Sequence, residues 1–105
     1  MYFVLNAPVL TAFGDYRFEG PLALDEARAF ALRGVRSAVG HAATADFLSE
    51  ILGIDIPWNR EAICMQPGDQ ALVLRLVDRL PEASILGAEA LRSTPHEFGV
   101  LKRLR

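Results

Sequence analysis

Cysteine is almost missing from this chain of 105 residues, in which Cys64 is the one copy. A single cysteine excludes an internal disulfide, and a structural zinc site normally needs four Cys or His ligands from the protein. We therefore expect Cys64 to be a small buried hydrophobic residue, and we expect the protein to need no metal and no cofactor.

Long apolar runs are absent as well, because no stretch approaches the roughly 20 residues that span a bilayer. The opening residues, MYFVLNAPVL, lack the positive start and the small-residue cleavage site of a signal peptide. We expect a cytoplasmic protein with no membrane partner, located in the cytoplasm of the host cell if a virus encodes it.

An excess of positive charge is also lacking, since the formal net charge is −2. Proteins that coat nucleic acid usually have a strongly basic surface, so we expect no long DNA or RNA as a partner. The basic residues are ten arginines and one lysine, Lys102. Arginine binds phosphate oxygens with two parallel hydrogen bonds, but a GC-rich genome would produce the same bias, and both explanations stay open.

The common catalytic motifs are missing too. The sequence contains no phosphate-binding Walker loop, no dinucleotide fingerprint, no nucleophile elbow and no zinc signature. From spacing alone, the chemistry that the chain offers is that of an anion site.

What is present is a regular series of short apolar segments that predicts one domain over residues 1–105. Five strands are predicted within residues 2–10, 12–20, 61–65, 71–77 and 97–104, and three helices within 23–34, 37–53 and 87–93. The turn QPGD should join the third and fourth strands as a hairpin. The fold class is therefore α/β, with a mixed central sheet of about five strands flanked by helices.

The best-defined element is the second helix. Ser37 is predicted to be its N-cap, small and apolar residues follow at helical spacing, and Gly53 is placed to end it in a left-handed conformation. His41 then lies within about one turn of the helix start, where unpaired N–H groups favour an anion. An imidazole titrates near neutral pH and can donate a proton, but a half-exposed surface histidine fits the same spacing.

Charged residues gather near the predicted hairpin. Arg60 precedes it, and Arg75 and Arg79 share one face of its second strand. That face could bind an anion, or it could be an exposed sheet surface that its charges keep soluble. Glu82 follows directly and could orient an arginine.

The run SAVGHAATADFLSEILG, followed by PWNR, PGDQALVLRL and DRLPEASIL, resembles the viral ring nuclease and anti-CRISPR family of small α/β proteins. The resemblance extends over nearly the whole chain. Its most specific part is the pattern of Ser37, Gly40, His41 and Thr44, which Asn59-Arg60 and Arg79-Leu80 with Glu82 accompany.

The resemblance implies an activity. Family members degrade cyclic tetra-adenylate, the second messenger of type III CRISPR systems, and so switch off the ancillary nucleases that it activates. The resemblance also implies a homodimer that holds one ring between its subunits. The expected products are linear di-adenylates with 2′,3′-cyclic phosphate ends, formed without metal.

The resemblance further implies roles for single residues. His41 would be the general acid, with Arg79 and Glu82 as further catalytic groups and Arg60 as a phosphate contact. The residues expected to bind the ligand beside Arg60 are Ser37, Gly40, Thr44, Asn6 and Thr11. Two other functions stay open: a module that sequesters cyclic oligoadenylate without cutting it, and a structural or protein-binding dimer.

Overall fold

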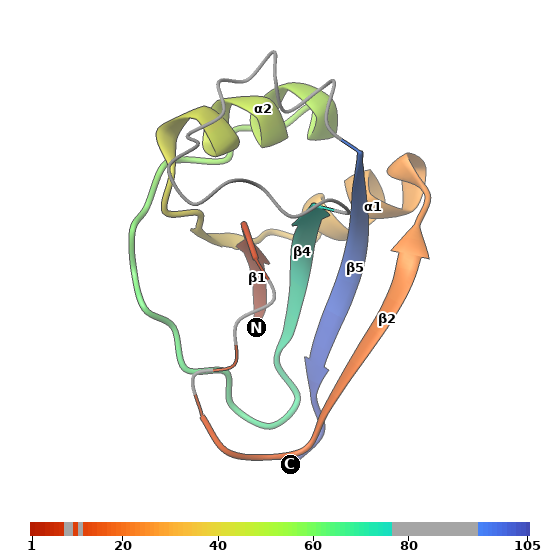
Figure 1. The fold of residues 1–105 in the computed structure, drawn as a ribbon, viewed down its shortest axis with the longest axis vertical. Coiled ribbons are helices and arrows are strands. Elements are labelled where there is room, and N and C mark those ends of the chain that lie inside the picture. Colours follow the sequence, from red (N-terminus) through yellow and green to blue (C-terminus); the bar gives the residue numbers. More distant parts are fainter. Residues whose placement is uncertain (8–9, 11, 77–94) are drawn as a thin grey trace.

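The described residues of the computed structural model form five strands and two helices (Figure 1). The structure describes residues 1–7, 10, 12–76 and 95–105. In chain order the elements are β1 (Tyr2–Leu5), β2 (Tyr16–Leu22), α1 (Leu24–Ala31), β3 (Arg36–Ala38), α2 (Ala42–Leu52), β4 (Gln70–Leu76) and β5 (His96–Arg103). The predicted α/β class with a mixed sheet of five strands is confirmed.

All five strands belong to one sheet, in the order β2-β5-β4-β1-β3. β1 lies between β4 and β3 and runs parallel to both, with Val4 opposite Ser37. β5 runs antiparallel to β4 and to β2. Because β1, β3 and β4 are parallel, their last residues, Leu5, Ala38 and Leu76, lie toward the same edge of the sheet.

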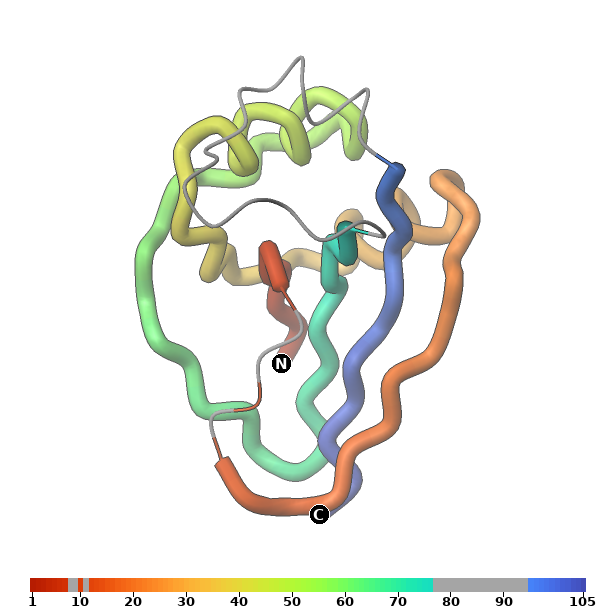
Figure 2. The backbone as a smooth tube through the Cα atoms, viewed as in Figure 1, coloured from red at the N-terminus to blue at the C-terminus, as the bar shows by residue number. Residues whose placement is uncertain are grey.

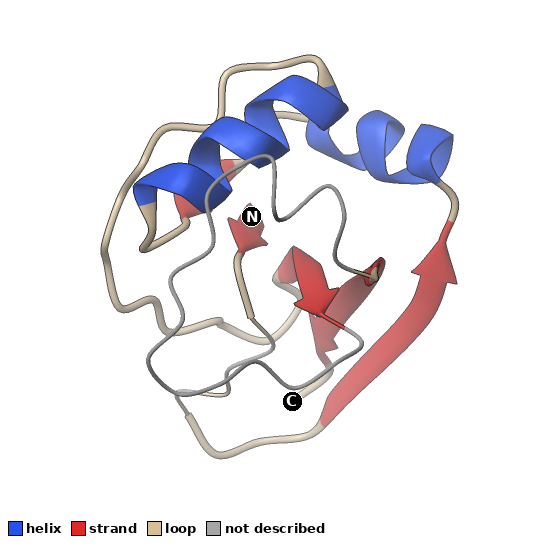
Figure 3. Cartoon of the chain, turned by 45° about the horizontal axis from the view of Figure 1, so that its top comes forward, coloured by secondary structure: helices blue, strands red, loops and turns tan. Residues whose placement is uncertain are grey.

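The two faces of the sheet are covered by different parts of the chain. Along β4, Leu72 and Leu74 belong to the core beneath α1 and α2, while Ala71 and Val73 belong to a second core on the opposite face. Figure 3 shows both helices along one side of the sheet. Since β4 is buried on both faces, its sequence is almost continuously apolar instead of alternating.

The opposite face is covered by the segment between α2 and β4. Figure 2 shows this segment in green as a long arm that runs from α2 to the turn before β4. Met65 of the arm is 4% exposed and packs in the second core with Phe3 and Leu5, and Ile63 lies against the same core.

The predicted hairpin is wrong. Residues 61–65, all of which are described, do not form a strand, and β4 pairs with β1 and β5 instead. The turn itself is present, because the N–H of Asp69 donates to the carbonyl of Gln66 at 2.9 Å. The predicted helix within 87–93 lies outside the described residues.

The burial of Cys64 is also wrongly predicted, since this side chain is exposed. Residues 61–65 have the alternation of an extended chain: Met65 is buried, Ile63 is half-buried, and Cys64 between them is turned to solvent. The side of the segment that meets the sheet therefore carries Ile63 and Met65 and not Cys64.

The start of α2 differs from the prediction, while its end agrees. Ser37 belongs to β3, and the residue that caps α2 is His41. The chain needs Ser37 to Gly40 to complete the sheet edge before it turns into the helix. Gly53 ends α2 with a φ of 73°, in the left-handed region that glycine tolerates without strain.

Candidate functional site

The candidate site lies where β1 and β3 end. Asn6 follows β1, and Gly40 and His41 follow β3. The side-chain Oδ1 of Asn6 accepts a hydrogen bond from the N–H of Gly40 at 3.4 Å, which ties the two strand ends together. In α/β sheets, ligands bind outside the carboxyl ends of parallel strands, so this edge is the natural place for a site.

His41 is exposed at the first turn of α2. Its backbone is extended, with φ −128° and ψ 128°, and its carbonyl accepts the N–H of Ala45 at 3.0 Å. Within the described part of the chain, its imidazole makes no hydrogen bond that caps the helix. The ring is therefore open to a ligand, next to the first-turn N–H groups that every helix leaves without an internal partner.

Thr44 lies in the same first turn and is half-buried. It therefore shares the helix start with His41, as the sequence pattern predicts. Gly40 directly precedes His41 and is also half-buried.

Ser37 lies deeper in the protein, at 5% exposure. Its hydroxyl donates to the carbonyl of Pro57 at 2.6 Å and accepts the N–H of Val39 at 3.3 Å. Both bonds are internal, so Ser37 supports the edge of the sheet. Its position gives it this role in place of the predicted helix cap.

Arg60 is brought to the site by a segment that lies alongside the end of β3. Val39 forms a parallel bridge with Trp58, and the N–H of Asn59 donates to the carbonyl of Val39 at 3.0 Å. The side-chain amide of Asn59 donates to the carbonyl of Ser37 at 2.7 Å. This double attachment fixes the backbone on which Arg60 stands.

The stem of Arg60 lies close to Gly40. A Cβ atom added to Gly40 would be 3.5 Å from Cγ of Arg60, an ordinary contact distance. Arg60 is exposed, and among the described residues its guanidinium makes no hydrogen bond, ion pair or aromatic contact. The site thus joins an unpaired cation to an exposed imidazole.

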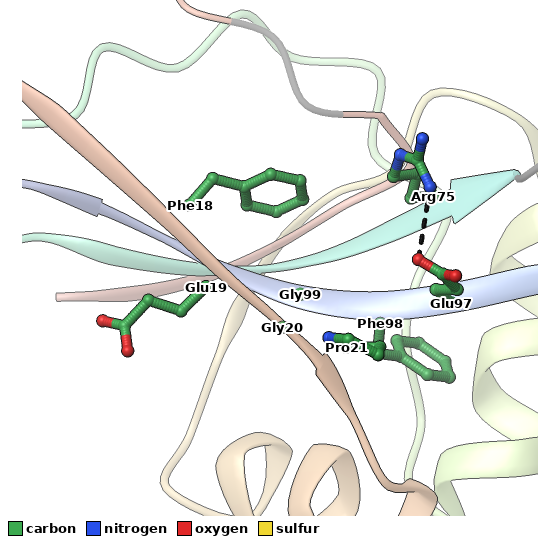
Figure 4. Close-up of a pocket in the computed structure, with 8 residues that line it drawn as sticks. All are labelled: Phe18, Glu19, Gly20, Pro21, Arg75, Glu97, Phe98 and Gly99. Carbon is green, nitrogen blue, oxygen red and sulfur yellow. Dashed lines mark hydrogen bonds and ion pairs between the residues drawn. The ribbon is translucent and has the colours of Figure 1, made fainter.

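Arg75 belongs to a different place. It forms an ion pair with Glu97 at 3.2 Å, at one side of a groove of about 250 Å³ over β2 and β5 (Figure 4). Phe18 lies above Gly99 in the same groove, so closely that a Cβ on Gly99 would be 2.6 Å from its ring. The pairing with Glu97 leaves Arg75 less available to an anion than Arg60.

Three other predicted site residues, Thr11, Arg79 and Glu82, lie outside the described residues. Within the described ranges, no group of three or more His, Cys, Asp or Glu side chains is placed to hold a metal ion. In the same ranges, neither helix has the length and apolar character needed to cross a membrane.

Two aromatic residues near this edge were not predicted from the sequence. His96 begins β5 and is half-buried, with its ring 5.2 Å from that of Phe47 on α2. Trp58 is 63% exposed although the bridge to Val39 holds its backbone. The apolar stripe of α2 could have indicated a partner for Phe47, but no sequence pattern distinguishes an exposed tryptophan from a buried one.

The fold has a counterpart among solved structures. B116 of Sulfolobus turreted icosahedral virus superimposes with a TM-score of 0.72 and 23% sequence identity, over 97% of this chain and 98% of that chain. This likeness shows the fold.

Sequence relatives extend to bacteria and other viruses. YddF of Bacillus subtilis (strain 168) is 33% identical over 103 residues, which are 95% of this chain and 94% of YddF. ORF117 of Acidianus two-tailed virus is 34% identical over 70 residues, 66% of this chain and 60% of ORF117. The STIV B116-like family model matches residues 2–98. The chain therefore belongs to the STIV B116-like family.

Proposed function

We propose that this protein is a metal-independent ring nuclease that cleaves cyclic tetra-adenylate in the cytoplasm and thereby switches off the ancillary nucleases of type III CRISPR systems. The observation that carries the proposal is the position of His41, exposed at the start of α2 and directly after Gly40, against which the stem of the unpaired Arg60 lies. The resemblance of the sequence to ring nucleases supplies the substrate.

The proposed reaction is an internal transfer at phosphorus. A ribose 2′-oxygen attacks the adjacent phosphate, the 2′-O–P bond forms, and the P–O5′ bond breaks. The 2′-hydroxyl proton passes to solvent, and the imidazolium of His41 protonates the leaving 5′-oxygen. Two such cuts convert the ring into two linear di-adenylates with 2′,3′-cyclic phosphate ends, with in-line positioning and charge stabilisation as the protein's contribution.

The remaining residues would hold the phosphates. Arg60 would bind a phosphate oxygen near Gly40, and the first-turn N–H groups of α2 would add hydrogen bonds. We assign Arg79 and Glu82 to the reacting phosphate and its orientation, on the sequence pattern alone. Asn6, Thr44 and Thr11 are proposed as further ligand contacts.

A second function is favoured by one feature of His41. General acids are usually oriented by a neighbouring group, whereas no described residue orients this imidazole. A protein that binds cyclic tetra-adenylate and leaves it intact would need no oriented acid, so a sponge is the alternative to a nuclease.

One assay separates these functions. The protein is incubated with cyclic tetra-adenylate in EDTA, and the nucleotides are resolved by chromatography. Di-adenylate products support the nuclease, and intact ligand that is retained by the protein supports the sponge. Ligand that is neither cut nor retained contradicts both and leaves a structural or protein-binding dimer.

A further inference from the structure

Trp58 is the one tryptophan of the chain and, at 63% exposure, one of the most exposed large apolar side chains among the described residues. Its backbone is held in place by two contacts. Trp58 forms a β-bridge with Val39, and the N–H of Asn59 donates to the carbonyl of Val39 at 3.0 Å. The bridge therefore fixes the backbone of an exposed aromatic residue beside the end of β3.

That place is beside the candidate site. Bridged strand positions lie about 4.8 Å apart, which sets the distance between the backbones of Trp58 and Val39. His41 is two residues beyond Val39, at most about 7 Å along an extended chain. Arg60 is two residues beyond Trp58, with its stem against Gly40. The residues that carry an aromatic ring, a cation and an imidazole thus lie close to one another along the backbone around Gly40.

We propose that Trp58 is the platform on which an adenine base of the bound ligand stacks. The inference rests on the proposed function, and it adds the group that recognises a base to the groups that bind phosphate. Proteins that bind single-stranded nucleic acid combine these same parts: aromatic side chains for the bases and a nearby cation for the backbone. A nucleotide with its phosphate on Arg60 would place its base within reach of Trp58.

Fluorescence tests the proposal directly, because all tryptophan emission of the protein comes from Trp58. Cyclic tetra-adenylate is titrated into the His41→Ala protein, which should keep the ligand uncut. We expect saturable quenching with cyclic tetra-adenylate and none with inorganic tripolyphosphate, which carries charge but no base.

Affinity gives a second measurement. Trp58→Ala should weaken the binding of cyclic tetra-adenylate roughly five- to a hundredfold, the range expected for the loss of one stacked base, and Trp58→Phe should restore most of it. In the cleavage reaction of the otherwise native protein, Trp58→Ala should raise KM more than it lowers kcat. The matched control is Leu32→Ala, which removes another exposed apolar side chain, at 73% exposure, just after α1.

The outcomes separate this inference from the proposed function. Calorimetric binding of cyclic tetra-adenylate without any change in Trp58 emission would reject the platform and leave the nuclease intact. Quenching of Trp58 by cyclic tetra-adenylate, together with a failure of the original protein to cut this ligand, would reject the nuclease and keep the platform. Emission that changes on dilution of the protein, and not with ligand, would assign Trp58 to a contact between two copies and overturn the proposal. A protein that neither binds nor cuts the ligand rejects both.

Discussion

His41 occupies a residue position that proteins usually give to Ser, Thr, Asn or Asp. The side chains of those residues accept a hydrogen bond from the first turn of the helix, and the imidazole of His41 makes no such bond among the described residues. A local rule broken at an exposed position, without structural gain, is typical of functional sites. We therefore expect that a capping residue in place of His41 raises the free energy of unfolding and lowers the rate of the proposed cleavage.

Replacing the imidazole tests its chemistry. His41→Ala should slow the cleavage of cyclic tetra-adenylate by about two to four decades, the usual contribution of a general acid, while binding largely survives. In the unmodified protein, the single-turnover rate should fall as the pH rises, because the acid must start protonated. That fall should vanish in the variant. Cleavage at the original rate with an unchanged pH profile would return His41 to the role of a surface residue.

Replacing His41 by a capping residue tests its cost to stability. His41→Ser should raise the free energy of unfolding by about 0.5 to 1 kcal/mol, because the serine hydroxyl can accept a first-turn N–H. Urea denaturation gives the free energy of unfolding of His41→Ser and of His41→Ala. The difference between the two variants measures the effect of the added cap, apart from the effect of losing the imidazole ring. If the serine variant is no more stable than the alanine variant, the site does not behave as a helix cap.

Among the described residues, Arg60 is the side chain that we propose binds a phosphate of the ligand. Arg60→Ala should weaken ligand binding by roughly 1.5 to 3 kcal/mol, the size of a charge-assisted hydrogen bond, and lysine should restore only part of the loss. The matched control is Arg17→Ala, on the outer strand β2, where the guanidinium is already 3.7 Å from Glu19. Equal losses in both variants, measured by calorimetry, would show a general charge effect and not a site.

At the scale of elements, the outer strand β2 is attached to β5 by charge as well as by backbone. Nζ of Lys102 lies 2.9 Å from Oε1 of Glu19, and Arg17 is a more distant neighbour of the same carboxylate. The hydrogen bond and the charge of Lys102 hold the pKa of Glu19 below its usual value. The pair should therefore stabilise the fold at neutral pH and cease to do so as the pH falls through this lowered pKa.

Removal of Lys102 tests the attachment. Lys102→Met should raise the pKa of the Glu19 carboxyl toward its ordinary value, as read from an NMR titration, and Arg17→Ala should raise it less. The stability difference between Lys102→Met and the original protein should be present at pH 7 and disappear at strongly acid pH. A difference that persists after the carboxyl is protonated would point to packing instead of charge.

Elements with a strong local pattern could be predicted from the sequence. Strand β5 and the end of α2 at Gly53 are marked by their own residues, a short run from Phe98 to Leu101 between charged residues in one case and a glycine stop in the other. Ser37 could not be placed, because a serine before a helix also fits a strand when a distant carbonyl, here that of Pro57, takes its hydroxyl. Residues 61–65 were wrongly predicted to be a strand for a related reason. Their apolar side chains alternate because they pack onto a face of the sheet, and not because the segment pairs with a strand.

The candidate site could be predicted only in part. Spacing indicates His41 and Arg60 as candidates and the resemblance assigns their roles, while the structure shows that the stem of Arg60 lies against Gly40, the residue before His41. The bond from Gly40 to Asn6 joins residues distant in the chain, and no spacing rule connects them. Trp58 was missed because its exposure depends on what the rest of the fold leaves uncovered.

For the whole molecule, the distribution of charge limits what one subunit can bind. Among the described residues, the other arginines each form an ion pair with a carboxylate, a hydrogen bond to a carbonyl or a contact with an aromatic ring. Arg60 is the exception. A four-phosphate ring needs more cations than the one unpaired arginine that the described part of the chain offers. Two subunits related by a two-fold axis would double the supply and match the symmetry of the ring.

We therefore predict a homodimer in solution, with one ring bound per two subunits. Light scattering should give twice the mass of the 11.5 kDa chain, and calorimetry should give a stoichiometry of about 0.5 ring per subunit. The stoichiometry is measured on the His41→Ala protein so that the ring stays closed. A stable monomer that still cleaves the ring would contradict the prediction.

The strand order also determines when the sheet can be completed during synthesis. Tyr16 of β2 finds its partner at Arg103 of β5, so β2 leaves the ribosome long before β5 exists. At the usual speed of synthesis, roughly 5 to 20 residues per second, the delay is on the order of ten seconds. During that time the residues of β2 have no β5 with which to pair. The alternating charges of β2, Arg17 and Glu19, and its Pro21, which has no N–H to offer, are the features that keep a waiting strand from pairing with the wrong neighbour.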